Sequence, residues 1–439
     1  MTITESGKVP TTSPTVQNTP RIKVLWASLV GTSLESYDFY VFSYLSAFFL
    51  GPLFFEPLRV FGGFLAAFLV NALGFVARPL GAIVFGQLGD RIGRRKTLIV
   101  TITVMGVATG LIGVLPDYAT AGYLGAVFLV ALRLIQGLSL AGEWGGAVLL
   151  ASEHGGPKRH GFYAAIPQLG SPIGSILTAA LYLSLPVLLS TDDLLAWGWR
   201  IPFLVAFPLL AVSLWLRFSA TETPVFEQVL AQERRERIPL LTAFRRRPVA
   251  LLLATGAALL GIGSYSLMNT YTLEYGAVQL GYDYNQLLLA TTIGALLQLI
   301  TIPLFGLWAS RIGSYRVVLI GAIGTLLVAF PIYFLLPSAS FAVLVGMMII
   351  GGILPTMSWA ALGGLLAELF GARIRYSAIA FAYAIAAIIS GFLLPLTYAF
   401  GEAVDYAWWH PAIVLAAISL ITAVAAYLSR NRVQPIETV

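Results

Sequence analysis

The segment from Leu132 to Gly146 reads LRLIQGLSLAGEWGG and lies inside an apolar run of residues 123–151. That run is long enough to cross a lipid bilayer as a helix. It nevertheless contains Arg133 and Glu143, although a charged side chain costs about 3 kcal/mol at the centre of a membrane helix. Since a helix turns by about 100° per residue, Glu143 shares a face with Gln136, and Arg133 lies beside that face. We expect this polar face to meet a partner helix or a water-filled cavity.

The charges in this segment are open to two interpretations. In one, Arg133 and Glu143 only form ion pairs that hold membrane helices together. In the other, they belong to a substrate and proton site of a transporter, because ionisable side chains within membrane segments mark such pathways. The organisation of the whole chain favours the second interpretation.

The composition of the chain is that of a membrane protein with many spans. Of its 439 residues, 58% are hydrophobic and 10% are charged, whereas soluble domains carry about 25% charged residues. The chain has no cysteine, which excludes disulfides, thiolate metal sites and cysteine nucleophiles. Its three histidines fall at predicted helix ends. We therefore expect no metal and no cofactor, and without a nucleophile–base–acid arrangement we do not expect an enzyme.

Apolar segments separated by Gly, Pro and charged residues predict an all-α membrane protein with twelve spanning helices. The fourth and fifth helices are expected at residues 121–151 and 162–189, with a break between them. The longest polar break follows the sixth helix and divides the chain into two bundles of six. The expected organisation is a disordered tail at 1–21, an N-terminal bundle at 22–219, a linker at 220–247, a C-terminal bundle at 248–430 and a short tail at 431–439.

Basic residues gather in alternate loops, which predicts the orientation of the chain. Arg94, Arg95 and residues 245–247 lie in loops on one side, whereas the loops on the other side carry mainly acids such as Asp117 and Asp283. The positive-inside rule then places both termini in the cytoplasm. The net charge of +6 follows from this topology and does not indicate nucleic-acid binding. We expect a multi-pass protein of the cytoplasmic (inner) membrane, surrounded by membrane lipid.

The two halves of the chain look like repeats of one another. The run GQLGDRIGRRK at residues 86–96 recurs as GLWASRIGSYR at 306–316. Such a duplication is typical of carriers that bind substrate near the membrane midplane, between the halves. Charged residues of the first half align with uncharged ones of the second: Asp38 with Ser266, Arg133 with Met348 and Glu143 with Ser358. We therefore expect nearly all intramembrane charge, and with it ionic substrate binding and proton coupling, in the N-terminal half.

Several motifs resemble those of a known family. The pattern GxxxDRxGRR at residues 86–95 resembles the cytoplasmic signature of the major facilitator superfamily, and RxxQG at 133–137 resembles its helix-four motif. Segments ESYDFY at 35–40, ARPLG at 77–81 and GEWGG at 142–146 are similar to its metabolite:proton symporter group. That group includes carriers of shikimate, 2-oxoglutarate, citrate and proline/betaine. The resemblance implies the major facilitator fold, with two bundles that rock around a central site.

The resemblance also implies a cytoplasmic gate in the loop between the second and third helices. The glycines there permit a tight turn. Asp90 can cap the positive N-terminal end of a helix in the other half, while the basic residues also set the topology. The expected gate residues are Gly86, Asp90, Arg91, Gly93, Arg94 and Arg95.

Three carboxylates are candidates for proton coupling. Glu35 and Asp38 lie three residues apart in the first helix and hence on one face, and Glu143 lies in the fourth helix. A buried carboxylate between apolar surroundings and cations can gain and lose a proton during a transport cycle. The alternative is that Asp38 is permanently paired with Arg78 or Arg133 and only holds helices together.

Arginine is the expected ligand of the substrate, because its guanidinium stays charged and binds a carboxylate with two parallel hydrogen bonds. Arg133 is the first candidate and Arg78 the second. Two fixed cations favour an anionic substrate. Neutral contacts are expected from both halves: Tyr37, Gln136, Gln168, Tyr265, Asn269, Gln298 and Tyr383.

These observations predict a transporter that works as a monomer and imports a small organic anion by proton symport and alternating access. A shikimate-like acid, a dicarboxylic acid and a tricarboxylic acid all fit the expectation. Coupling to protons would offset the inside-negative membrane potential, which opposes anion entry by about 2.3 kcal/mol per charge per 100 mV. The alternatives are a proton-driven exporter on the same fold, a carrier of a zwitterionic osmolyte, and a membrane sensor that transports nothing.

Overall fold

The computed structural model describes residues 21–81, 84–85, 94–139, 143–218, 239–338, 340–371 and 374–434. Those residues form helices and connections without any strand, which confirms the expected all-α class. Nine helices among them are long and apolar enough to span a membrane. Two further apolar helices, Ile99–Ile112 and Tyr123–Ser139, are shorter. The chain is thus a multi-pass membrane protein, while the number of twelve spans and the cytoplasmic termini stay predictions.

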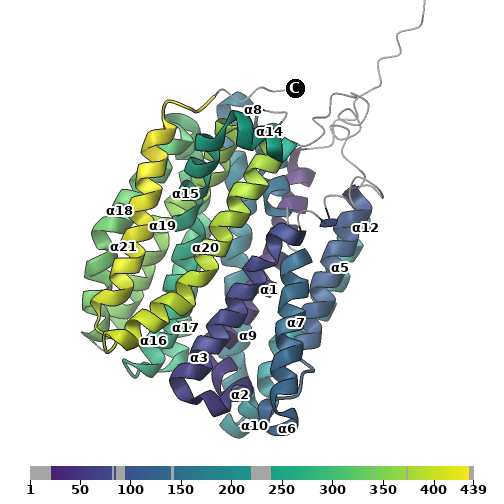
Figure 1. The fold of residues 1–439 in the computed structure, drawn as a ribbon, viewed down its shortest axis with the longest axis vertical. Helices are drawn as coiled ribbons and strands as arrows, with labels where there is room; N and C mark the ends of the chain where they lie inside the picture. Colours follow the sequence, from purple (N-terminus) through teal and green to yellow (C-terminus); the bar gives the residue numbers. More distant parts are fainter. Residues whose placement is uncertain are drawn as a thin grey trace, which may run out of the picture.

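The N-terminal half forms the right-hand bundle in Figure 1. Its long helices stand side by side, with the short helices α2, α6 and α10 at the lower end. Its elements are α1 (Arg21–Phe48), α2 (Leu50–Phe54), α3 (Arg59–Val76), α5 (Arg94–Ile112), α6 (Tyr118–Ala121), α7 (Tyr123–Ser139), α8 (Glu143–Ala165), η2 (Ile166–Leu169), α9 (Gly170–Leu188), α10 (Thr191–Ala196), α11 (Ile201–Leu204) and α12 (Ala206–Phe218).

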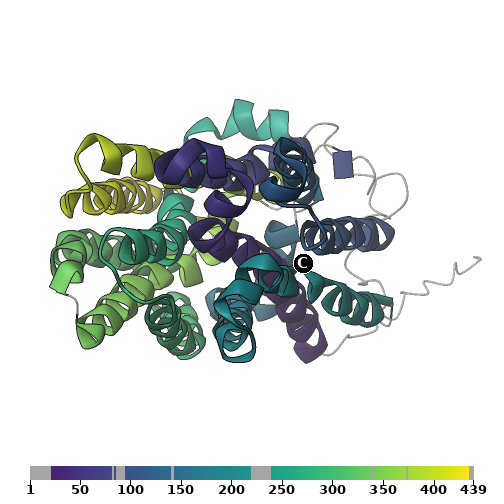
Figure 2. The ribbon, with the colours of Figure 1, turned by 90° about the horizontal axis from the view of Figure 1, so that it is seen from below.

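The C-terminal half forms the left-hand bundle in Figure 1. The view from below in Figure 2 shows the two groups of helices beside one another. Its elements are α14 (Pro239–Arg246), α15 (Pro248–Tyr265), the π-turn η4 (Ser266–Tyr271), α16 (Thr272–Val278), α17 (Tyr284–Ile312), α18 (Ser314–Leu335), α19 (Phe341–Leu369), α20 (Arg375–Ala403) and α21 (Trp409–Ser429). Helix α14 lies in the expected linker and packs against α15 and α20.

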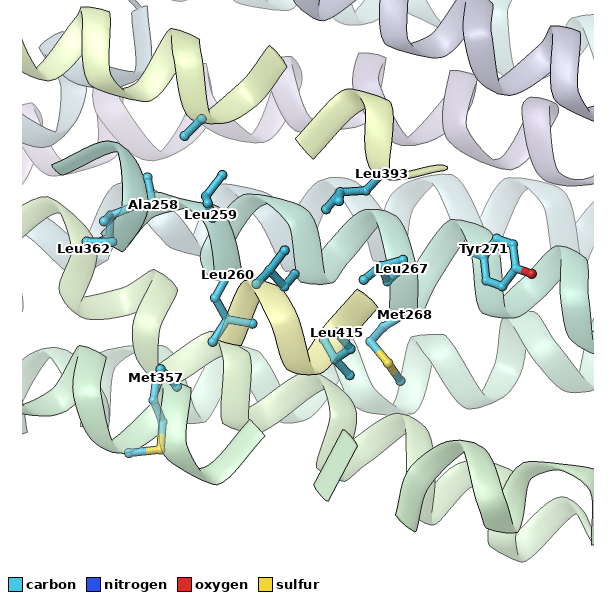
Figure 3. Packing of buried hydrophobic residues seen from close by; sticks show 14 of the residues in the cluster. Ala258, Leu259, Leu260, Leu267, Met268, Tyr271, Met357, Leu362, Leu393 and Leu415 are labelled. Carbon is cyan, nitrogen blue, oxygen red and sulfur yellow. The ribbon is translucent and has the colours of Figure 1, made fainter. Parts of the chain in front are cut away.

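The core of the C-terminal half is built along α15 and η4 (Figure 3). Leu260 and Leu267 pack there with Leu393 of α20 and Leu415 of α21. Tyr271 lies at the edge of this apolar cluster in the same view. Because α15 is apolar all round, it is buried among neighbouring helices, as its sequence predicts.

Four pairs of helices form most of the contact between the halves. Helix α3 packs against α20, helix α8 packs against both α17 and α19, and helix α9 packs against α17. Within the N-terminal half, α3 and α7 cross very closely at Gly137, where an added Cβ atom would collide with the carbonyl oxygen of Gly74. Small residues permit such crossings in membrane proteins.

One expected helix boundary is wrong. The sequence predicts a break between residues 151 and 162, but α8 is continuous from Glu143 to Ala165. The candidate membrane span begins only at Arg159. Hydropathy marks where a helix leaves the apolar layer, and a helix can continue beyond that layer into water.

Candidate functional site

A small cavity lies between the two halves, beside the π-turn η4. Its volume is about 10 Å³, close to the room that one water molecule needs. Among the described residues, none with a formal charge lines it. A metabolite therefore fits only if the halves move apart. The polar lining comes from both halves: Tyr40, Ser175, Tyr265, Asn269, Thr291 and Gln298.

Two tyrosines close this cavity across the two halves. The rings of Tyr40 in α1 and Tyr265 in α15 are 4.2 Å apart between centroids. The Tyr40 hydroxyl is hydrogen-bonded to Ser171 of α9, and the Tyr44 hydroxyl lies 3.1 Å from the Ser175 hydroxyl. Aromatic faces and hydroxyl groups thus form the wall that a ligand would meet.

Asp38 lies in a polar network inside the N-terminal bundle, where it is 3% exposed. Its Oδ1 atom accepts hydrogen bonds from the Thr109 hydroxyl and from Gln136 Nε2, at 2.8 Å. Gln136 Nε2 also donates to the Thr109 hydroxyl at 2.9 Å. The other carboxylate oxygen, Oδ2, has no hydrogen-bond partner among the described residues. One oxygen is therefore fixed by α5 and α7, whereas the other makes no hydrogen bond within the described part of the chain.

Arg133 holds the same network from the side of α7 and is 2% exposed. Its Nη1 donates to Gln136 Oε1 at 3.2 Å, and its Nη2 donates to Asn71 Oδ1 at 2.7 Å. Phe42 lies against the guanidinium, with the ring centroid 4.1 Å from Cζ. Backbone of α3 covers the Nε atom, since a Cβ added to Gly74 would lie 2.7 Å from it. Arg133 is thus enclosed within one half.

Arg78 occupies a different place, at the contact between the halves. It is 8% exposed and interacts with Tyr383 of α20 as well as with Asp38 of its own half. Its Nε atom has no hydrogen-bond partner among the described residues. Glu35 also lies close to Tyr383. Arg78 is therefore a buried cation that both halves share.

An aromatic layer packs against Tyr383, the partner of this arginine in the other half. Trp144 of α8 stacks on Tyr383 with ring centroids 4.1 Å apart and an interplanar angle of 12°. Its Nε1 donates to Gln168 Oε1 at 3.0 Å, and Gln168 Nε2 donates to the Trp359 carbonyl oxygen at 3.3 Å. The layer links α8 and η2 of one half to α19 and α20 of the other.

The structure therefore distributes the predicted site residues over three places. Tyr265, Asn269 and Gln298 line the cavity. Arg78, Gln168 and Tyr383 belong to the aromatic layer, near Glu35. Asp38, Arg133 and Gln136 lie inside the N-terminal bundle. Tyr37 also points within that half, because its hydroxyl donates to the Pro202 carbonyl oxygen at 2.5 Å.

The expected cytoplasmic gate falls mostly outside the described part of the chain. A described contact between the halves joins α8 to α19, where His160 Nε2 lies 2.8 Å from Glu368 Oε1. The backbone N–H of Phe162 donates to the Ser310 hydroxyl at 2.9 Å. The residues outside the description are Gly86, Asp90, Arg91 and Gly93, together with the side chains of Arg94, Arg95 and Glu143.

The halves also meet at the opposite end, the lower end in Figure 1. Tyr398 of α20 stacks on Phe61 of α3, with centroids 5.4 Å apart and an interplanar angle of 12°. Phe48 and Tyr284 meet edge to face at 4.6 Å between centroids. Among the described residues the halves are thus in contact at both ends, with the cavity of about 10 Å³ between these contacts.

The expectation that nearly all intramembrane charge lies in the N-terminal half overlooks a buried acid of the C-terminal half. Glu274 of α16 is fully buried in the C-terminal half, with 0% exposure. A single acid scarcely changes the mean hydropathy of the apolar segment around it, so the segment still reads as an ordinary membrane span. The signal that could have found it is the group of tyrosines that accompanies it in the sequence, at Tyr271 and Tyr275.

Comparison with known proteins supports this architecture. The family model described as Major Facilitator Superfamily matches residues 39–290 and 253–438. A crystal structure of a D-xylose-proton symporter has the same fold, with a TM-score of 0.74, 19% identity and coverage of 95% of this chain and 99% of that chain.

Curated relatives are more similar in sequence. The inner membrane metabolite transport protein YhjE of Escherichia coli (strain K12) is 33% identical over 418 residues, 94% of each chain. The shikimate transporter of the same organism is 33% identical over 413 residues, 92% of this chain and 93% of the relative. A proline/betaine transporter of Salmonella typhimurium is 30% identical over 425 residues, 93% of this chain and 84% of the relative. The chain is a membrane transporter rather than an enzyme, and it belongs to the major facilitator superfamily, in the metabolite transporter group that its motifs indicate.

Proposed function

We propose that this protein imports a small organic anion together with protons, by alternating exposure of a site between its two halves. The observation that carries the proposal is the position of Arg78, a permanently charged guanidinium at the contact between α3 and α20. A carboxylate that entered from the cavity side could accept hydrogen bonds from it. Shikimate-like acids and di- or tricarboxylic acids share this chemistry.

Arg78 supports this role better than Arg133 does. Each Nη atom of Arg133 already donates a hydrogen bond within the N-terminal bundle, to Gln136 or to Asn71, and α3 covers its Nε atom. A ligand could reach Arg133 only if the N-terminal bundle came apart. In a carrier whose bundles move as rigid bodies, the ligand binds where the bundles meet. Arg133 then positions Gln136 and, through it, Asp38.

Asp38 would bind and release the proton that is coupled to transport. Arg78 interacts electrostatically with both Asp38 and Tyr383. The positive charge of Arg78 opposes proton binding by Asp38. An anion bound to Arg78 would offset that charge, so binding of the anion and binding of the proton would favour each other. Release of the proton on the inner side would then weaken the anion site. We place both termini in the cytoplasm and the protein in the inner membrane, in line with the distribution of basic residues.

The experiment is uptake into proteoliposomes that contain the purified protein. Shikimate, citrate and 2-oxoglutarate are offered with an inward-directed proton gradient and with the reversed gradient. Symport predicts that the inward gradient accelerates uptake of at least one of these acids. Acceleration by the reversed gradient alone would identify an exporter, and no flux of any compound under either gradient would favour the sensor hypothesis.

A second candidate is a carrier of a zwitterionic osmolyte. The observation that favours it is the uncharged aromatic lining of the cavity, where Tyr40 and Tyr265 present their rings. Quaternary ammonium groups bind to such aromatic faces. Glycine betaine in the same uptake assay separates the two candidates, because a betaine carrier would take it up while leaving shikimate and citrate outside.

A further inference from the structure

Glu274 is a buried carboxylate that the proposed transport site does not use. It lies in α16, directly after the π-turn η4, and is 0% exposed. Neither of its carboxylate oxygens has a hydrogen-bond partner in the described part of the chain. The ion pair found among the described residues joins His160 and Glu368 at the other end of the molecule. Glu274 therefore sits in the protein interior without a cation.

Its neighbours are tyrosines from several elements. Tyr271 of η4, Tyr284 of α17, Tyr398 of α20 and Tyr406 after α20 all interact with the carboxylate. Tyr398 comes closest, although neither it nor Glu274 completes a hydrogen bond of normal geometry. The surroundings are thus weak proton donors rather than counter-ions.

A histidine completes this cluster. His410 of α21 is 0% exposed, and its Nδ1 lies 2.6 Å from the Ala407 carbonyl oxygen. A carbonyl oxygen can only accept, so Nδ1 carries the hydrogen and Nε2 of the neutral ring accepts one from the Tyr271 hydroxyl. The titratable groups that face Glu274 or its partners in the described part of the chain include Tyr271, Tyr275, Tyr284, Tyr333, Tyr398, Tyr406 and His410, with Glu402 beside Tyr406.

The same cluster touches the contact between the halves. Tyr398 stacks on Phe61 and meets Phe68 edge to face, with centroids 5.5 Å apart and an interplanar angle of 82°. Both phenylalanines belong to α3 of the N-terminal half. A change at Glu274 therefore reaches the α3–α20 contact through a single side chain.

We propose that Glu274 is a proton-binding site that controls whether this end of the transporter is closed. A buried carboxylate without a cation or a full set of donors must either carry a proton or be reached by water. With the proton, Glu274 stays in its tyrosine surroundings and Tyr398 holds α3. Without it, water must enter, and that separates α20 from α3. Low pH thus favours the closed end and high pH the open end.

The test is a distance measurement that needs no substrate. The chain has no cysteine, so Val60→Cys in α3 and Leu396→Cys in α20 allow a clean pair of spin labels at positions that are 62% and 63% exposed. Pulsed electron paramagnetic resonance in lipid nanodiscs is recorded from about pH 5 to about pH 9, the range in which buried carboxyl groups titrate. We expect one short distance at low pH and a growing longer one at high pH.

Glu274→Gln keeps the shape of a protonated glutamate and should keep the short distance at every pH. Tyr398→Phe keeps the ring on Phe61 but removes the donor nearest the carboxylate, so its transition should move to higher pH. Glu368→Gln, which removes a buried carboxylate at the other end, is the matched control. Loss of its contact with His160 can change the fraction of the short distance, but the distance should still depend on pH as in the parent. A Glu274→Gln curve that matches the parent curve, or a parent distance that does not change, would overturn the proposal.

Two further outcomes also decide the matter. Loss of the pH dependence in Glu368→Gln as well would show a general effect of charge and overturn the assignment to Glu274. If the pH dependence is lost in His410→Gln but kept in Glu274→Gln, the titrating group is the histidine, and this too would overturn the proposal. The inference uses the transporter fold but not the proposed anion, and its failure is distinguishable because uptake of organic acids is measured separately.

Discussion

Asp38 and Glu274 are buried carboxylates of the described residues, one in each half, and their surroundings are opposite. Asp38 accepts hydrogen bonds from Thr109 and Gln136, with Arg133 as the next group in the network. Glu274 has tyrosines around it, but neither a hydrogen bond nor a cation in the described part of the chain. In the proposed cycle, the first carboxylate binds and releases a proton while its hydrogen bonds to Thr109 and Gln136 are kept. In the proposed gate, the second loses its proton only when water enters.

This difference separates two tasks in a coupled carrier. A proton site next to the substrate must respond to the substrate's charge, which requires cations such as Arg78 close by. A proton site that reports whether one end is open must instead respond to water, which requires an apolar surrounding and no fixed partner. The predictions below change one feature of this comparison at a time.

The largest effect is expected from Arg133→Ala. The change leaves Asn71 and Gln136 without their charged donor inside the N-terminal bundle, and breaking a buried charged interaction costs about 3 kcal/mol or more. Thermal unfolding of the purified protein in detergent should show a strongly lowered Tm. If the variant instead keeps its Tm and loses only its affinity for carboxylates, Arg133 is the substrate ligand that the sequence indicates first.

Arg78→Ala should lower mainly the affinity for the substrate rather than the Tm, the reverse of Arg133→Ala. Loss of the charged hydrogen bonds to a carboxylate, worth about 1.5–3 kcal/mol, corresponds to an affinity lower by about tenfold to a hundredfold. The Tm should fall less than in Arg133→Ala, because the Arg78 Nε has no hydrogen-bond partner in the described part of the chain and the side chain loses mainly its interaction with Tyr383. Substrate binding by calorimetry and Tm are measured on the same preparation. Arg78→Lys is the control: it keeps the charge but not the paired geometry, and should lie between the parent and the alanine variant.

The fold was largely predictable, because apolar runs, the internal repeat and the loop charges all follow from local composition. The site was predictable only in part. A helical wheel places Arg133 and Gln136 on one face but does not say which neighbour that face meets, and the neighbour proved to be α3 of the same half. The surroundings of Glu274 could not be predicted for a different reason. The π-turn η4 inserts an extra residue into the helix, so the faces after Tyr271 no longer follow the regular period.

Asp38→Asn tests the carboxylate that has partners. An asparagine can keep the contacts with Thr109 and Gln136 but cannot bind and release a proton. Uptake should therefore lose its dependence on an inward proton gradient, while exchange of labelled for unlabelled substrate across the membrane continues. Both rates are measured in proteoliposomes. Gradient-driven uptake that persists in this variant would assign the coupling proton to another group, with Glu35 and Glu143 as the next candidates.

The smallest effect is expected on local stability at Asp117. This carboxylate lies outside the membrane spans, accepts hydrogen bonds and also faces water. Its Oδ1 accepts from the Thr120 hydroxyl at 2.6 Å and from the Thr120 backbone N–H at 2.9 Å. These hydrogen bonds lower the pKa of Asp117. A lowered folded pKa gives stabilisation that is present above the ordinary value of about 3.9 and is lost as the pH falls through the folded value.

Asp117→Asn keeps a residue that caps helices well but removes the charge. The local stability of α6 should therefore no longer fall in acid. Hydrogen exchange of residues 118–121 is followed from neutral pH to about pH 3, where the parent should lose local stability by less than about 1 kcal/mol because the site is largely solvated. Conformation elsewhere should not change. An Asp117→Asn variant that altered the α3–α20 distance would mean that any carboxylate can move this end, and burial without partners would no longer distinguish Glu274.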